Sequence, residues 1–224
     1  MCGRFTLFCE IETICLRFKA EKASVEIGPR YNIAPNNIVL AIVNGTKRQL
    51  KLFRWGLIPS WAKEAVIGHK MINARAETLA TKPSFKKALR KQRCLILADG
   101  FYEWRKEGRN KWPVYYQLKS TELFAFAGLW DSWTSAAGDR IESCTIITTE
   151  SNSLVAEIHD RMPVILASET EDYWLDSSIT DSEEIITFLK PYPAELMQSH
   201  EVSRLVNSPA YDGPECIKPL TNPT

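Results

Sequence analysis

Residues 94–104 read Cys-Leu-Ile-Leu-Ala-Asp-Gly-Phe-Tyr-Glu-Trp, an apolar run and an aromatic run on either side of Asp99-Gly100. Both runs have the length and apolar character of strands, and Asp-Gly is a turn-forming pair. Three more strand-like runs follow between turn-rich segments, at 113–118, 124–130 and 143–148. Strands that follow one another without helices between them argue against a regular alternation of the two, and indicate an α+β fold.

The sequence before this region adds two strands and two amphipathic helices. Residues 38–43 and 49–53 have strand-like composition, and Asn44-Gly45 between them predicts a turn. The spacing of apolar residues predicts a helix within 9–20 and another that Pro83 opens. We therefore expect a single α+β domain with a mixed, largely antiparallel sheet system and peripheral helices.

Capping sequences predict short helices in the last third of the chain. Asn152 is placed to cap one helix, the capping-box sequence Ser168–Glu171 opens a second, and Ser182 caps a third. A short strand is expected at 164–166. The remaining C-terminal sequence is rich in Pro, Ser and Asn, so we expect it to be mostly irregular, with one strand at 202–206.

The composition is that of an ordinary soluble globular protein. The chain has 224 residues, of which 45% are hydrophobic and 25% charged, and its formal net charge is +1. This balance argues against a globally basic nucleic-acid binder, so any nucleic-acid site must be a local patch. No signal peptide or membrane-spanning run is visible, and we expect a cytoplasmic protein without a membrane anchor.

The six cysteines do not form a metal-binding or redox motif. No CxxC pair occurs, and Cys9 and Cys15 are too far apart to suggest one. Cys94 and Cys144 lie inside apolar runs and are typical of small buried hydrophobic residues. In a reducing compartment these thiols stay reduced. We expect no metal ion and no cofactor.

The N-terminal sequence Met-Cys-Gly-Arg-Phe makes Cys2 a candidate nucleophile. Initiator Met is usually removed before a small residue, and its loss would leave Cys2 with an α-amine and a thiol on adjacent carbons. Both groups are partly nucleophilic near neutral pH. A 1,2-aminothiol condenses with an aldehyde to an imine, which the thiol closes to a five-membered thiazolidine. The alternative, an incidental cysteine in a frayed terminus, is the one that this short sequence favours when taken alone.

Polar residues interleave with alanine in Asn73-Ala-Arg75-Ala-Glu77. On a strand, Asn73 and Arg75 would lie on the same face and could reach one ligand. Buried polar groups need partners, which argues against a place in the core. An exposed loop is the alternative.

Two titratable side chains lie in settings suited to proton transfer. Glu103 is flanked by aromatic residues, which would disfavour its charged form and raise its pKa towards the range useful for a proton carrier. His159, one of three histidines, precedes a proline-containing turn and could act as a general acid or base, while nearby Arg161 could hold a phosphate. A solvent-facing glutamate and a structural histidine are the alternatives.

The sequence Arg54-Trp-Gly-Leu-Ile-Pro-Ser-Trp61 offers aromatic surfaces on which unpaired bases could stack. Tryptophans are also common in cores, which is the alternative for Trp55.

Six motifs occur here in the order seen in the SOS response-associated peptidase (SRAP) family, which the chain resembles from Cys2 to about Val206. The resemblance implies one SRAP-like domain over residues 1–224, with its core in 2–206 and sheets that form a pseudo-barrel. The six motifs are the N-terminal Met-Cys-Gly-Arg-Phe, Tyr31-Asn-Ile-Ala-Pro35, Arg54-Trp-Gly-Leu-Ile-Pro59, Asn73-Ala-Arg-Ala-Glu-Thr78, the quoted 94–104 stretch and His159-Asp-Arg-Met-Pro163.

The resemblance also implies a function and a set of residues. Members of the family cross-link to abasic sites in single-stranded DNA, the partner expected here, and Cys2 would be the covalent residue. Asn73 would hold Cys2 and the sugar, and Glu103 would carry protons and assist the autoproteolytic removal of Met1. His159 would open the sugar ring and support reversal, so the chemistry is lyase-like. The implied DNA contacts are Arg4, Pro35, Trp55, Arg75 and Arg161.

Two other functions stay open at this stage. The first is a thiol peptidase or amidase with Cys2 as nucleophile, His159 as base and Glu103 as its orienting partner. The second is a non-covalent single-stranded DNA-binding module in which Cys2 is passive. A structural protein without activity is a third alternative, which the ordered motifs disfavour. Nothing in the sequence requires an oligomer, so we expect a monomer.

Overall fold

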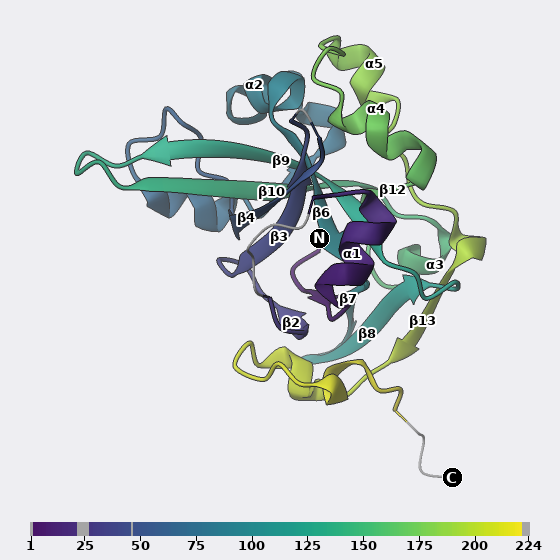
Figure 1. The fold of residues 1–224 in the computed structure, drawn as a ribbon. Coiled ribbons are helices and arrows are strands. Elements are labelled where there is room, and N and C mark those ends of the chain that lie inside the picture. Colours follow the sequence, from purple (N-terminus) through teal and green to yellow (C-terminus); the bar gives the residue numbers. More distant parts are fainter. Residues whose placement is uncertain (1, 22–26, 46, 221–224) are drawn as a thin grey trace.

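Five strands close into a barrel at the centre of the protein. The computed structural model describes residues 2–21, 27–45 and 47–220 (Figure 1). The order around the barrel is β10–β4–β3–β6–β9, and β9 pairs back with β10. Only the β10–β4 pair is parallel, with Ser143 opposite Arg54, and this makes the barrel mixed. The barrel strands are β3 (Ile38–Val43), β4 (Gln49–Trp55), β6 (Arg93–Ala98), β9 (Phe124–Thr134) and β10 (Arg140–Glu150).

A second sheet of five antiparallel strands lies against the barrel, in the order β13–β8–β7–β1–β2. Short strands β5, β11 and β12 extend the barrel sheet at β10 and β9. The second-sheet and short strands are β1 (Phe5–Leu7), β2 (Arg30–Ile33), β7 (Gly100–Glu107), β8 (Asn110–Leu118), β13 (Met197–Glu201), β5 (Asn73–Arg75), β11 (Arg161–Pro163) and β12 (Ile165–Leu166). The expected α+β domain with a mixed, largely antiparallel pseudo-barrel is confirmed.

The Asp99-Gly100 pair is the point at which the chain passes from one sheet to the other. Strands β6 and β7 are consecutive in sequence, but β6 belongs to the barrel and β7 to the second sheet. A Cβ atom at Gly100 would lie only 2.3 Å from the ring of Tyr115 on the neighbouring strand. Glycine is therefore favoured here because the Tyr115 ring occupies the space that a side chain would need.

Alternation of side chains along β7 gives the second sheet two different faces. Phe101 faces the barrel, where its ring centroid lies 6.2 Å from that of Phe126. Phe5 on the adjacent strand packs in the same layer, with its ring 5.1 Å from Trp55. Tyr102 faces away and belongs to a separate apolar cluster beneath the sheet. Glu103 therefore lies on the barrel side, next to the core.

Helices lie around the sheets, as expected, and most of the predicted ones are present. Pro83 opens α2 as predicted, and the Asn152 side chain accepts a hydrogen bond from the backbone N–H of Val155 at the start of α3. The α-helices are α1 (Ile11–Phe18), α2 (Pro83–Lys91), α3 (Ser153–Ala156), α4 (Glu171–Leu175) and α5 (Ser182–Ile186). Short 3-10 helices occupy Ala65–Lys70, Ala76–Thr78, Ser168–Thr170, Ala194–Leu196, Arg204–Asn207 and Pro214–Ile217.

Two predicted helix caps are wrong. The Ser168–Glu171 sequence forms no capping box, because Glu171 is buried and accepts hydrogen bonds from Arg17 and Arg48 instead. The cap of α5 is Asp181, one residue before the predicted Ser182. In the first case the Glu171 carboxylate pairs with two guanidinium groups rather than with a backbone N–H. In the second, the Asp181 carboxylate accepts from the backbone N–H of Glu183 in place of the Ser182 hydroxyl.

The predicted strand at 202–206 is also wrong. Strand β13 lies earlier, at Met197–Glu201, and Val202 and Val206 instead pack into the cluster beneath the second sheet. Strands β3 and β4 are paired as predicted, with Val43 opposite Gln49, and the segment that contains Asn44-Gly45 links them. Residue 46 of that link lies outside the described residues.

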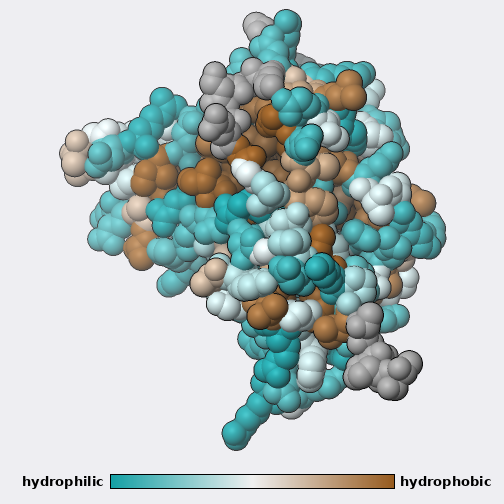
Figure 2. Space-filling view, turned by 60° about the horizontal axis from the view of Figure 1, so that its bottom comes forward, coloured by the Kyte–Doolittle hydropathy of each residue, from teal (hydrophilic) through white to brown (hydrophobic). Residues whose placement is uncertain are grey.

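Apolar side chains on the surface are dispersed. The face in Figure 2 shows brown apolar patches separated by hydrophilic side chains. Large exposed apolar side chains come from separate segments, among them Leu16, Ile38, Trp61 and Tyr173. Within 2–21, 27–45 and 47–220, no helix has both the length and the apolar character needed to cross a membrane.

Candidate active site

The N-terminal residues run beside the strand that carries Glu103. Strand β1 lies between β2 and β7, and the backbone N–H of Tyr102 donates to the carbonyl oxygen of Arg4 at 3.0 Å. This pairing places Cys2 at the edge of the barrel, where it is fully buried. The Cys2 thiol donates weakly to the Arg4 carbonyl oxygen, with Sγ 3.9 Å away. The folded sheet therefore brings the N-terminal cysteine to the interior rather than leaving it frayed.

Asn73 holds the backbone of Cys2. Its Nδ2 donates to the Cys2 carbonyl oxygen at 2.8 Å. Strand β5 positions this amide by pairing in parallel with β10, where Asn73 lies opposite Ile146. The Asn73 Oδ1 atom is buried and accepts no hydrogen bond within the described part of the chain. A buried amide oxygen without a donor is costly, so this atom is suited to accept from a ligand.

Glu103 is poised to exchange protons near neutral pH. Its side chain is only 3% exposed, and burial raises its pKa to about 7, because a charged carboxylate is poorly solvated there. Burial also raises the pKa of the Cys2 thiol, and the nearby charge of Glu103 adds to this effect. Glu103 therefore lies close enough to Cys2 to influence the ionisation of its thiol.

His159 follows α3 and is partly buried. Its Nδ1 accepts a hydrogen bond from the backbone N–H of Arg161 at 2.9 Å. Burial lowers the pKa of His159, an effect that the Asp160 carboxylate, 2.9 Å from Nδ1, opposes. Since burial is the larger cause, the neutral ring is favoured.

A cavity of about 420 Å³ joins these groups on the surface. Glu103 from β7 and His159 from the segment after α3 both line it, beside Gly3 and Arg4. The remaining lining residues are Trp104, Lys106, Lys111 and Asn207. One cavity thus holds two proton-exchanging side chains, three cations and the backbone next to Cys2.

Lys106 and Lys111, which sequence reasoning missed, give the cavity a basic rim. They lie directly opposite each other on β7 and β8, and both are exposed. Like charges directly opposite on a sheet repel, so the pair favours an anion between them. If a hairpin turn had been assigned at Gly108 from the sequence, its register would have placed Lys106 opposite Lys111. Asn207, also missed, reaches the cavity from a segment with no sequence signal.

The other predicted cationic residues lie in different settings. Arg161 is already paired, because its guanidinium donates to both Glu77 carboxylate oxygens, at 2.6 and 3.0 Å, and to the Thr148 carbonyl oxygen. Arg75 is exposed, on the same side of β5 as Asn73. Arg4 lines the cavity, as noted above. Arg75 and Arg161 do not line the cavity.

The prediction that Trp55 contacts bases is wrong. Trp55 is fully buried, packs against Phe5 and donates from Nε1 to the Ile72 carbonyl oxygen at 2.8 Å. A side chain without accessible surface cannot stack on a base. Trp61, at the other end of the same aromatic segment, is 59% exposed and offers the surface that was expected of Trp55. Pro35 is half-buried in the loop after β2, outside the cavity lining.

Acid and thiol side chains do not gather into a metal site in the part of the chain that the structure describes. There, no group of three or more His, Cys, Asp or Glu side chains is placed to bind a metal ion.

Comparison with known proteins identifies the family. The family model described as SOS response associated peptidase (SRAP) matches residues 1–209. The chain belongs to the SRAP family. The SRAP proteins that it resembles include the abasic site processing protein YoqW of Bacillus subtilis, 50% identical over 222 residues, which cover 97% of this chain and 99% of that protein.

The chain is also similar to a more distant sequence relative and to a solved structure. The abasic site processing protein HMCES of Gallus gallus is 35% identical over 201 residues, covering 79% of this chain and 59% of that protein. A crystal structure of a Bacteroides thetaiotaomicron protein superposes with a TM-score of 0.91 at 30% identity, covering 98% of this chain and 100% of that one. The SRAP fold described above is therefore found in a solved structure of closely similar architecture.

Proposed function

We propose that this protein captures abasic sites in single-stranded DNA by a covalent bond to Cys2, after Met1 has been removed. The observation that carries this proposal is the hydrogen bond from Asn73 to the Cys2 carbonyl, which fixes the nucleophile beside a cavity shared by Glu103 and His159. The names of the relatives, abasic site processing proteins, support the same class of substrate. The site would act on a sugar aldehyde.

The proposed reaction balances as a condensation. Hydrolysis of the Met1–Cys2 peptide bond, assisted by Glu103, first frees the α-amine. The amine adds to the open-chain aldehyde of the abasic sugar to give a carbinolamine, which loses water to form an imine. The Cys2 sulfur then adds to the imine carbon, and the thiol proton passes to the nitrogen. The product is a thiazolidine, and the net by-product is one water molecule.

Three side chains have distinct proposed roles. Glu103, with a pKa near neutrality, donates a proton to the departing water and takes one from the thiol. His159 protonates and deprotonates the sugar hydroxyls as the ring opens, and supports reversal by the same steps. Asn73 holds the Cys2 carbonyl through Nδ2, while its unpartnered Oδ1 accepts from a sugar hydroxyl. Each role follows from an atom that lies at the site.

Cationic and aromatic side chains would hold the DNA strand. Arg4 and the Lys106–Lys111 pair line the cavity and would contact phosphates there. We propose Arg75 and Arg161 as further phosphate contacts, with Arg161 exchanging part of its pairing with Glu77 for a phosphate oxygen. Pro35 and exposed Trp61, rather than Trp55, would pack against bases.

The thiol peptidase alternative is less well supported. Peptidases of this kind use a cysteine whose pKa is lowered by a neighbouring imidazolium or helix terminus. Burial here raises the pKa of the Cys2 thiol instead, and Glu103 adds a negative charge nearby. The thiol also donates to the Arg4 carbonyl oxygen. These features argue against a thiolate that is held ready for repeated turnover.

The proposal is tested with a single-stranded oligonucleotide that carries one abasic site. Processed protein, shown by mass spectrometry to lack Met1, should give a slower band on a denaturing gel and a mass equal to protein plus DNA minus water. An intact oligonucleotide of the same sequence is the control. A fully processed protein that gives no such band would overturn the covalent function and leave non-covalent binding as the explanation for any affinity.

Neutralising Lys106 and Lys111 should weaken DNA binding most at low salt. If each lysine contacts one phosphate of a single strand, each Lys→Gln change should reduce the slope of log affinity against log salt by about 0.7. Fluorescence anisotropy with an intact oligonucleotide measures this slope without the covalent step. Lys119→Gln, at an exposed site outside the cavity, is the matched control. Unchanged slopes in both cavity variants would show that the rim does not contact DNA.

A further inference from the structure

A C-terminal strap, which we define as Ser203–Ile217, covers the face of the second sheet that points away from the barrel. Val206 and Cys216 are fully buried there with Tyr102 and Tyr115. In Figure 1 this yellow segment passes beneath β2 and β8. Since Glu103 follows Tyr102 on β7 and faces the barrel, the strap supports the strand that carries Glu103 from its opposite face.

Asn32, on β2, ties the strap to the N-terminal residues. It is fully buried. Its Nδ2 group donates hydrogen bonds to three strap carbonyl oxygens, those of Val206 at 3.2 Å, Ser208 at 3.0 Å and Tyr211 at 2.5 Å. Its Oδ1 accepts from Arg4 Nη1 at 2.6 Å. One buried amide thus connects the strap with Arg4, and no group of comparable shape could satisfy all these partners.

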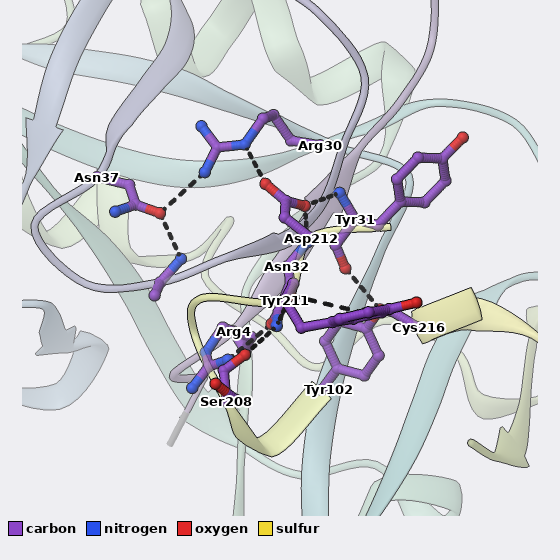
Figure 3. A network of polar contacts seen from close by, with 11 residues as sticks. Arg4, Arg30, Tyr31, Asn32, Asn37, Tyr102, Ser208, Tyr211, Asp212 and Cys216 are labelled. Atoms are coloured by element: carbon purple, nitrogen blue, oxygen red, sulfur yellow. Dashed lines mark hydrogen bonds and ion pairs between the residues drawn. The ribbon is translucent and has the colours of Figure 1, made fainter. Parts of the chain in front are cut away.

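Asp212 fixes the strap to β2 at a second point (Figure 3). Its Oδ1 accepts from the backbone N–H groups of Tyr31, at 2.5 Å, and Asn32, at 2.7 Å. Its other oxygen pairs with Arg30 Nε. Hydrogen bonds to a carboxylate are stronger than those to a neutral oxygen, so this residue is the main clamp of the strap.

Arg4 connects the strap to the cavity. Its Nη1 also donates to the Val206 carbonyl oxygen at 2.8 Å, and its guanidinium lies over the Trp104 ring at 5.8 Å. Its Nε is buried and unpartnered within the described residues, so it can donate to a bound anion. The strap adds Asn207 to the cavity wall, where Asn207 Oδ1 accepts from Trp104 Nε1 at 2.7 Å.

We propose that Asn32 and Asp212 are positioning residues for the capture reaction, because they hold the strap against Arg4 and so fix the backbone of Cys2 two residues away. This inference rests on the proposed function for its kinetic consequence. Chain termini fray unless they are tied down. Displacement of a reacting group by about 1 Å can slow a reaction about 100-fold.

The test is single-turnover cross-linking at saturating abasic DNA, at temperatures where thermal melts show each variant to be folded. Asp212→Ala should lower the saturating rate constant at least tenfold. Asp212→Asn, which keeps an acceptor for the backbone N–H groups, should recover most of it. Tyr211→Phe is the matched control, since it removes only the strap's internal hydrogen bond to Glu215. If Asp212→Ala does not fold, Arg30→Gln replaces it, with an expected loss of about threefold to tenfold.

Hydrogen exchange of the N-terminal peptide provides a second readout that does not depend on DNA. The Arg4–Phe5 amides should exchange at least tenfold faster in Asp212→Ala than in the wild type or in Tyr211→Phe. A wild type that forms no cross-link would refute the proposed function, while this exchange result would still decide the positioning role. Unchanged exchange, a rate constant within twofold of the wild type, or an equal loss in Tyr211→Phe would overturn the inference.

Discussion

A Cys2→Ser variant should form no DNA cross-link that survives denaturation, a loss of at least about 100-fold relative to the wild type. Serine keeps the α-amine and permits removal of Met1, so the imine can still form. Its hydroxyl is a far poorer nucleophile than a thiol near neutral pH, so the five-membered ring does not close. The imine then hydrolyses during denaturation. Denaturing gels with an abasic oligonucleotide measure the loss.

Reduction with borohydride distinguishes the role of the Cys2 α-amine from the role of its thiol in this experiment. Borohydride converts an imine to a stable secondary amine, so Cys2→Ser and Cys2→Ala should both be trapped on DNA when it is present. Mass spectrometry confirms that Met1 is absent from each variant. A stable cross-link from Cys2→Ser without reductant would show that the thiol is not needed. Failure to trap either variant would show that the α-amine is not the first nucleophile.

A Glu103→Gln variant should cross-link about 100-fold more slowly, the usual contribution of one well-placed proton carrier. Because the pKa of Glu103 is about 7, both of its protonation states are populated near neutral pH. The wild-type rate should therefore change with pH around this value, and the variant should lack that inflection. Single-turnover rates between pH 5.5 and about 8.5 would measure both effects. A rate within threefold of the wild type would contradict the assigned role.

The same substitution should not weaken the fold. The pKa of Glu103 rises from 4.5 in an unfolded chain to about 7 in the folded one, so the folded state disfavours the charged form. The resulting destabilisation is absent below pH 4.5, grows as the pH rises and is complete above about 7. Glu103→Gln should thus stabilise the protein at pH 8, by an amount on the order of 3 kcal/mol. A variant that reacts more slowly but unfolds less readily would show that the substitution impairs the cross-linking reaction and not the folding of the protein. For the rates of the wild type and the Glu103→Gln variant to be compared, the Cys2 amine must be freed without the help of Glu103, for example by cleavage of an N-terminal fusion.

Much of the fold could be predicted from local patterns. The apolar runs at 38–43 and 94–98 and the helix at Pro83 are where their composition placed them. Strands β1, β2 and β5 could not be predicted because they are three or four residues long and gain stability only from neighbours. The sequence Met-Gln-Ser-His-Glu at 197–201 has little strand character, yet β8 pairs with all of it. Tertiary pairing outweighed local preference there.

The candidate site was predicted in part. Motif resemblance pointed to Cys2, Asn73, Glu103 and His159, and the fold brings the first two into contact and the last two into one cavity. The Trp55 prediction failed because a tryptophan beside an arginine and a glycine looks the same in sequence whether buried or exposed. The role of Asp212 could not be foreseen, because its partners lie about 180 residues away in sequence.

The hydrogen bond between Arg4 and Val206 has a consequence for biosynthesis. Its partners are 202 residues apart. At about 5–20 residues per second, a ribosome needs roughly 10–40 seconds to deliver the second partner after the first. A nascent chain therefore exposes Cys2 well before the wall around it is complete. Prematurely terminated translation products that lack the strap would keep Cys2 but not its fixed setting.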